Sequence, residues 1–86
     1  MSEYLISYSY GPKDQSEVLS FSYSVNEGIE LDKNDQIVYL AVLDNLRSHG
    51  IELPEAITVK PGSNSFQRHF SGTQVHEITK CILLGG

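Results

Sequence analysis

Two segments near the start of the chain alternate between large apolar and small polar residues, and this alternation restricts the fold more than any other feature. In residues 4–10, tyrosines and an isoleucine take every second position, and residues 18–25 repeat the pattern. A period of two is typical of a β-strand with one buried face. The turn signal Gly11-Pro12 lies between the segments. The sequence therefore predicts an antiparallel hairpin whose buried face holds Tyr4, Ile6, Tyr8, Tyr10, Leu19, Phe21, Tyr23 and Val25.

A helix is predicted after the hairpin. Asp32 or Asn34 is placed to cap its start, with further acids in its first turn. Gly50 is placed to end it in the left-handed conformation. Residues 37–43 alone would also suit a buried strand, but the caps and the continuing periodicity favour a helix. Its apolar stripe consists of Val38, Tyr39, Val42, Leu43 and Leu46.

The second half of the chain gives weaker signals. Residues 56–60 predict a short strand, and Phe66 and Phe70 are expected to anchor the stretch that follows. Residues 74–84 suit a helix or a strand, and we favour a strand because a hairpin and one helix leave a sheet that needs more strands. The prediction is a single α+β domain over residues 1–86, with a mixed sheet of about four strands packed on one central helix.

Several classes of protein are not expected. The longest wholly apolar run, residues 37–43, is too short to span a bilayer. The first ten residues include Glu3 and no basic residue, which predicts no secretory signal. Cys81 is the single cysteine, so no internal disulfide can form. We therefore expect a cytoplasmic protein without a membrane partner.

The charges are unevenly distributed along the chain. The net charge is −5, and residues 1–55 hold ten of the eleven acids but three of the six bases. A negative chain repels phosphates, so direct nucleic-acid binding is not expected. The acids crowd most closely before the helix, which suits a basic protein partner but also an ordinary solvated surface. This candidate partner-binding cluster consists of Glu27, Glu30, Asp32 and Asp35.

The sequence predicts no catalytic group and no metal site. His76 and Cys81 are five positions apart, so they diverge on a helix and face opposite sides on a strand. Together with His69 they match no zinc spacing. The segment 32–35 lacks the glycine and the distal glutamate of a calcium loop. We therefore expect a protein that is not an enzyme and that uses no cofactor.

The chain ends in Gly85-Gly86. A diglycine has no Cβ atoms, so it can thread a narrow channel and present its carboxylate. The predicted order of hairpin, helix, strand, strand and diglycine resembles the β-grasp of ubiquitin-like proteins and of small sulfur carriers. Residues 50–54 are similar to the Gly-Ile-Pro turn after the ubiquitin helix, and residues 72–75 to the Gly-x-x-Val that introduces the last strand of the sulfur carriers.

This resemblance implies a carrier function. In that family an ATP-dependent activating enzyme adenylates the terminal glycine, which is then passed to a partner as a thioester, an isopeptide or a thiocarboxylate. The resemblance implies that Gly86 bears the reactive carboxylate and that Gly85 gives the backbone its reach. A second interpretation comes from the charges. It is a small acidic inhibitor or adaptor, of the kind that phages and mobile elements encode. Such a protein would cover a basic surface of a larger protein machine with residues 27–35 and the exposed face of the helix.

Overall fold

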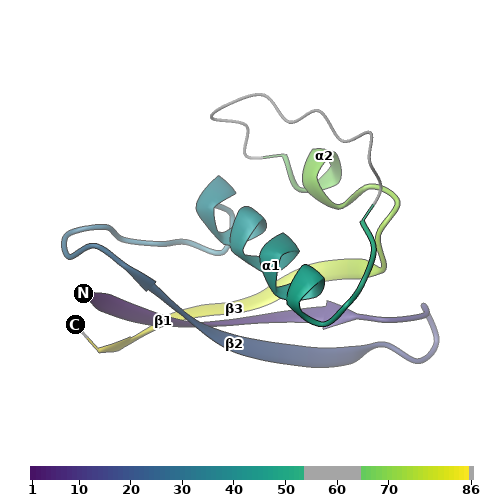
Figure 1. Ribbon diagram of the computed structural model, residues 1–86, viewed down its shortest axis with the longest axis horizontal. Helices are drawn as coiled ribbons and strands as arrows, with labels where there is room; N and C mark the ends of the chain where they lie inside the picture. The colour runs from purple at the N-terminus through teal and green to yellow at the C-terminus, as the bar shows by residue number, and fades with distance from the viewer. Residues whose placement is uncertain (54–64, 86) are drawn as a thin grey trace.

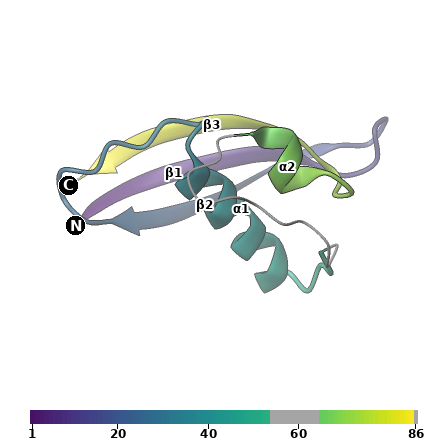
Figure 2. The same ribbon diagram turned by 90° about the horizontal axis from the view of Figure 1, so that it is seen from above.

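The computed structural model describes residues 1–53 and 65–85. Within them three strands form one sheet in the order β2-β1-β3. Both helices lie on the same side of this sheet (Figures 1 and 2). The predicted α+β class is therefore confirmed. The elements are β1 (Ser2–Tyr10), β2 (Glu17–Val25), α1 (Gln36–Ser48), α2 (Phe66–Phe70) and β3 (Val75–Gly85).

The predicted hairpin is confirmed. Strands β1 and β2 pair antiparallel without a register shift, from Ser2 opposite Val25 to Tyr10 opposite Glu17. The aromatic face lies toward the helices, and Tyr8 is completely buried beneath them. On β2, Leu19, Phe21 and Tyr23 of the same face are only half-buried, because β2 forms an edge of the sheet, whereas Val25 is buried.

The cap of helix α1 lies one residue after Asn34 and three residues after Asp32, the two predicted caps. The N-cap is Asp35, whose side chain makes no capping hydrogen bond. It accepts instead from the backbone N–H of Asp32 at 2.8 Å. The caps predicted at Asp32 or Asn34 are therefore wrong, as are the predicted acids in the first turn.

The predicted end of α1 is confirmed. Gly50 has a φ of 78°, which a residue with a Cβ rarely adopts. Its N–H donates to the Arg47 carbonyl at 2.9 Å, and the N–H of Ile51 donates to the Leu46 carbonyl at 3.2 Å. These two bonds form a Schellman motif, which turns Ile51 back against the core.

One set of contacts holds α1 on the sheet, and a second holds α2 against α1. The hydroxyl of Tyr8 donates to Asn45 Oδ1 at 2.7 Å, which ties the central strand to α1. At the other contact, the ring of Tyr39 on α1 meets the rings of Phe66 and Phe70 edge-on, with centroids 5.9 and 5.6 Å away. The prediction that both phenylalanines are anchors is confirmed.

The sheet differs from the prediction in strand number and direction. The described residues hold three strands rather than about four, and both pairings are antiparallel rather than mixed. The predicted strand at residues 56–60 lies outside the described residues. Of the ambiguous segment 74–84, residues 75–84 lie in strand β3, so the favoured strand is confirmed.

The direction of β3 follows from where the chain re-enters the sheet. Helix α2 and the turn after it bring the chain to the Tyr10 end of β1, so Val75 pairs with Tyr10. The N–H of Gly11 donates to the Gln74 carbonyl at 3.1 Å and fixes this entry point. From there β3 can only run back along β1, which makes the pair antiparallel. No helix in the described part of the chain is long and apolar enough to cross a bilayer.

The position of α1 predicts the effect of two matched substitutions. Leu46 is 0% exposed and Leu40 is 46% exposed on the same helix. Leu46→Ala is expected to lower the free energy of unfolding by about 2–5 kcal/mol, because it leaves a cavity in the core. Leu40→Ala is expected to stay within about 0.5 kcal/mol of the wild type. Chemical denaturation measures both, and equal losses would contradict this packing of α1.

Candidate functional site

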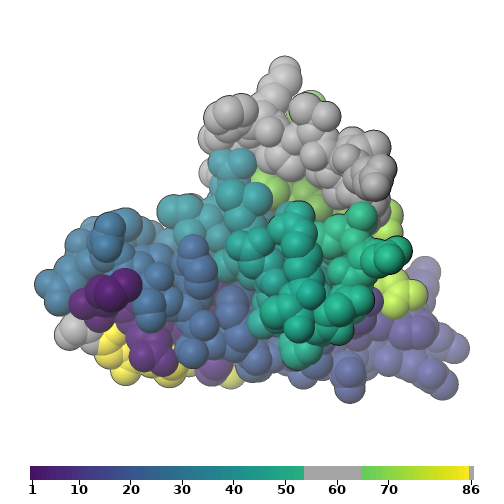
Figure 3. Space-filling view, viewed as in Figure 1, coloured from purple at the N-terminus to yellow at the C-terminus, as the bar shows by residue number. Residues whose placement is uncertain are grey.

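The candidate site is the loop of residues 26–35 between β2 and α1, which we call the acidic loop. It lies at the end of the sheet where β1 begins and β3 ends (Figures 1 and 2). In Figure 3 its blue residues lie beside the purple N-terminal residues and the yellow end of β3. Glu27, Glu30 and Asp32 are exposed, and Asp35 is half-buried. The four predicted acids are therefore brought together on one loop.

Buried contacts fix the backbone of the acidic loop. A turn at Gly28, with a φ of 88°, lets the Ile29 N–H donate to the Asn26 carbonyl at 3.3 Å. Leu31 then enters the hydrophobic core. The Tyr4 hydroxyl accepts from the Leu31 N–H and donates to the Ile29 carbonyl, both at 3.3 Å. The Tyr4 hydroxyl thus binds the backbone on both sides of Glu30 and fixes this part of the loop to the central strand.

The second half of the loop is held at the start of α1. Asp35 bonds to Asp32 through its side chain and its backbone. The Cys81 thiol lies 3.9 Å from the Leu31 carbonyl. Burial, and then the carboxylates of Asp32 and Asp35, raise the pKa of the Cys81 thiol. The same three causes raise the pKa of the Tyr39 hydroxyl, so the acids influence groups on both α1 and β3.

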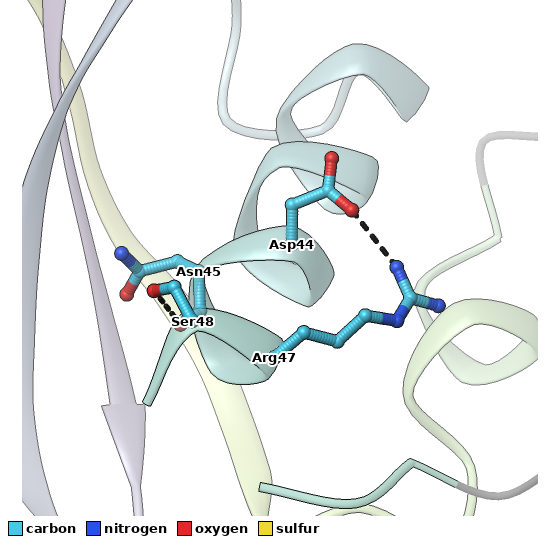
Figure 4. A network of polar contacts seen from close by, with 4 residues as sticks. All are labelled: Asp44, Asn45, Arg47 and Ser48. Atoms are coloured by element: carbon cyan, nitrogen blue, oxygen red, sulfur yellow. Dashed lines mark hydrogen bonds and ion pairs between the residues drawn. The ribbon is translucent and has the colours of Figure 1, made fainter. Parts of the chain in front are cut away.

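Within the described residues, one ion pair involves the acidic loop. Glu27 lies 3.3 Å from the Met1 amino group, and both groups are exposed. The other ion pair of the described chain joins Asp44 to Arg47 on α1 at 2.8 Å, beside the bond from Ser48 to Asn45 (Figure 4). Exposed ion pairs contribute at most about 1 kcal/mol. The charges of the loop therefore remain available to a partner.

Apolar side chains lie at the same end of the sheet. Leu83 is 58% exposed and Leu84 is 53% exposed near the end of β3. Leu83 pairs with Tyr4 in the ladder, and the hydroxyl of this tyrosine also binds Ile29, which is itself exposed. Apolar groups beside charged ones are the usual composition of a protein-binding surface.

The second candidate is the diglycine. Gly85 is the last residue of β3 and pairs with Glu3. A Cβ atom at Gly85 would meet no atom within 4 Å, and its φ is not in the left-handed region. The other four glycines of the described chain all have positive φ: Gly11, Gly28, Gly50 and Gly72. The fold itself therefore does not require glycine at position 85. Gly86 lies outside the described residues.

The two histidines considered as catalytic or metal-binding candidates both contact backbone carbonyl groups. His69 is buried, with Nδ1 2.8 Å from the Ser65 carbonyl oxygen and its ring 4.9 Å from that of Tyr39. His76 Nε2 lies 2.7 Å from the Gly11 carbonyl oxygen. Within residues 1–53 and 65–85 no three potential ligands group together to hold a metal ion.

A pocket of about 230 Å³ opens between the start of α1 and β3. Lys33, His76 and Glu77 supply its charged and titratable groups. His76 is already bound to the backbone at Gly11.

The tyrosines of β1 do not offer a nucleic-acid site. Tyr4 and Tyr8 are buried in the core, so they do not form a surface on which nucleic-acid bases could stack.

Comparisons with protein families, with curated proteins and with solved structures find no match to this chain. The site is therefore defined by its own geometry.

The sequence did not predict two residues of this site. Leu31 is an apolar residue between acids, and this isolation is a signal that it anchors the loop. The alternation of β1 predicted that the Tyr4 ring is buried, but a period of two says nothing about the bonds of its hydroxyl.

The anchoring role of Tyr4 leads to a test with a matched control. Tyr4→Phe leaves the Leu31 N–H buried without its partner, so we expect a loss of about 1–3 kcal/mol in the free energy of unfolding. Cys81 should also react faster with iodoacetamide, because the loop beside it loosens. Tyr23 faces Tyr4 across the hairpin, and its hydroxyl makes no hydrogen bond within the described chain. Tyr23→Phe should therefore change neither quantity, and equal effects of the two substitutions would contradict the anchor.

Proposed function

We propose that this protein is a non-enzymatic inhibitor or adaptor that covers a basic surface of a larger cytoplasmic protein with its acidic loop. One observation carries the proposal. The loop displays four acids on a backbone that Tyr4 and Leu31 fix to the core. A preorganised loop loses little conformational entropy on binding, so more of the interaction energy remains as affinity.

Glu27 and Glu30 are the best candidates for direct contact with the partner. Both side chains are exposed, and neither accepts a hydrogen bond from α1. Asp32 and Asp35 instead shape the start of α1 through their mutual bonds. Ile29 lies between the two glutamates and is exposed. This arrangement suits a target surface with Lys or Arg around a small apolar site.

Charge reversal tests this function. The protein is immobilised, and the partner is captured on it from an extract of cells that carry the gene. The partner is then purified, and the kinetics of its binding to the protein are measured. The double substitution Glu27→Lys and Glu30→Lys is expected to slow association about tenfold or more at low salt. The difference should shrink at high salt, because ions screen exposed charges.

The control has the same charge change at the opposite end of the sheet. Asp14 and Glu17 are exposed on and beside the β1–β2 turn. Asp14→Lys with Glu17→Lys also moves the net charge from −5 to −1, but should slow association much less. If both pairs had the same effect, only the net charge would matter and the acidic loop would not be the interface.

The carrier function is a second candidate, favoured by Gly85. This glycine has neither the backbone conformation nor the crowding that would require it, so passage through an enzyme channel is a reason for its presence. In this candidate the Gly86 carboxylate attacks the α-phosphate of ATP, forms an acyl-adenylate and releases pyrophosphate. A thiol of the activating enzyme then displaces AMP. The order of hairpin, α1 and late strand is the one expected of a β-grasp, but the antiparallel pairing of β3 with β1 differs from the mixed sheet of that fold. The carrier candidate therefore rests on Gly85.

Chemical capture tests the carrier candidate. The purified chain is incubated with ATP, hydroxylamine and an extract of cells that carry the gene. We expect an ATP-dependent hydroxamate at Gly86 in the intact mass, because hydroxylamine displaces the activating group from the carboxylate. Deletion of Gly86 should abolish the product. Gly85→Ala should leave the melting temperature unchanged, because its Cβ meets no other atom. Absence of the hydroxamate from the wild type would reject this candidate.

A further inference from the structure

Strand β2 has an outer edge that no strand of the described chain covers. It is nine residues long, and its register with β1 is uninterrupted. Residues 18–25 contain no charged residue, proline or glycine. A long, regular edge with free N–H and C=O groups is a template for another strand, and proteins usually disrupt such edges.

The other edge of the sheet is disrupted. The pairing of β3 with β1 shifts register at three places. Glu77 and Lys80 place exposed charges on β3. Irregularity and charge are the ordinary means by which an edge strand avoids pairing. Within residues 1–53 and 65–85, one edge of the sheet is therefore protected and the edge at β2 is open.

The side chains of β2 are also incompletely covered by the described residues. Leu19, Phe21 and Tyr23 pack against the core but remain half-buried. Phe21 meets the ring of Tyr8 edge-on, with centroids 6.1 Å apart, on the inner side only. On the other face, Val18 is 61% exposed. An added strand would bury all four side chains.

We propose that the occupant of this edge is a second copy of the chain, paired antiparallel through β2. A two-fold axis at Phe21 pairs all nine residues of both strands, and any other centre leaves residues unpaired. Three of the four apolar residues of the core face then meet another, since Leu19 faces Tyr23 of the second copy and Phe21 faces its own equivalent. Directly opposed aromatic and aliphatic side chains stabilise antiparallel strands.

The charges permit this pairing although each chain carries −5. Glu17 faces Val25 of the second copy, so no two acids are directly opposed. Continuing the register beyond the strands brings Glu27 near Gln15 and Lys13 of the second copy. The result is a six-stranded sheet, and the two acidic loops lie at its opposite ends. This dimer goes beyond the proposed function and does not depend on it.

Disulfide cross-linking tests the register. In a Cys81→Ala background, Val18→Cys on one chain faces Ser24→Cys on the other, and both positions are exposed. Directly opposed residues have Cβ atoms about 4.5–5.5 Å apart, close enough for a disulfide with small adjustments. In an equimolar mixture, unlike chains should cross-link about tenfold faster than like chains. Equal rates for like and unlike chains would overturn the proposed register.

Sedimentation equilibrium tests the dimer itself. The wild type should move toward twice its monomer mass of 9.6 kDa as its concentration rises into the millimolar range. The exposed substitutions Val18→Lys and Ser22→Lys should raise the dissociation constant about tenfold or more, because they crowd like charges across the seam. Gln67→Lys with Gln74→Lys adds the same charge away from β2 and should not. Circular dichroism confirms that each variant is folded. A monomeric wild type, or unchanged association of the β2 variant, would refute the proposal.

Discussion

The tyrosines of the central strand hold the rest of the molecule in place. Strand β1 pairs with a strand on each side. Its aromatic face therefore forms the centre of the sheet surface that the hydrophobic core of the described chain packs against. The Tyr8 ring fills that core while its hydroxyl fixes α1 through Asn45. The Tyr4 hydroxyl does the same for the acidic loop. Burial, and then the neighbouring Tyr10, raise the pKa of Tyr8, which keeps this hydroxyl a hydrogen-bond donor at any ordinary pH.

Aromatic contacts close the core at its other end. A short helix such as α2 is not stable alone, so its position depends on the rings that it buries. Phe66 and Phe70 contact Tyr39, and His69 completes the cluster. Ser65 accepts from the Arg68 N–H at 3.4 Å and caps the helix start. The placement of α2 then determines where β3 enters the sheet, so a cluster of rings determines a strand direction.

Local patterns predicted the elements, whereas long-range contacts decided their arrangement. A period of two revealed β1 and β2, and helical spacing with Gly50 revealed α1 and its end. The direction of β3 was not predictable, because it depends on how α2 packs against Tyr39. The helix cap was misplaced because two aspartates and an asparagine in residues 32–35 are equally good caps by type. At the site, the sequence identified the acids but not the Tyr4 hydroxyl that holds them.

The fold accounts for two of the four acids of the acidic loop better than for the other two. Asp32 and Asp35 lie at the N-terminus of α1, where the helix dipole favours negative charge, and their bonds shape the helix start. That effect falls off within about one turn, so it does not extend to Glu27 and Glu30. Those glutamates receive little compensation within the described chain, since the contact of Glu27 with the Met1 amino group is exposed. Stability therefore accounts for two acids of the loop, and the other two are the ones that a partner would explain.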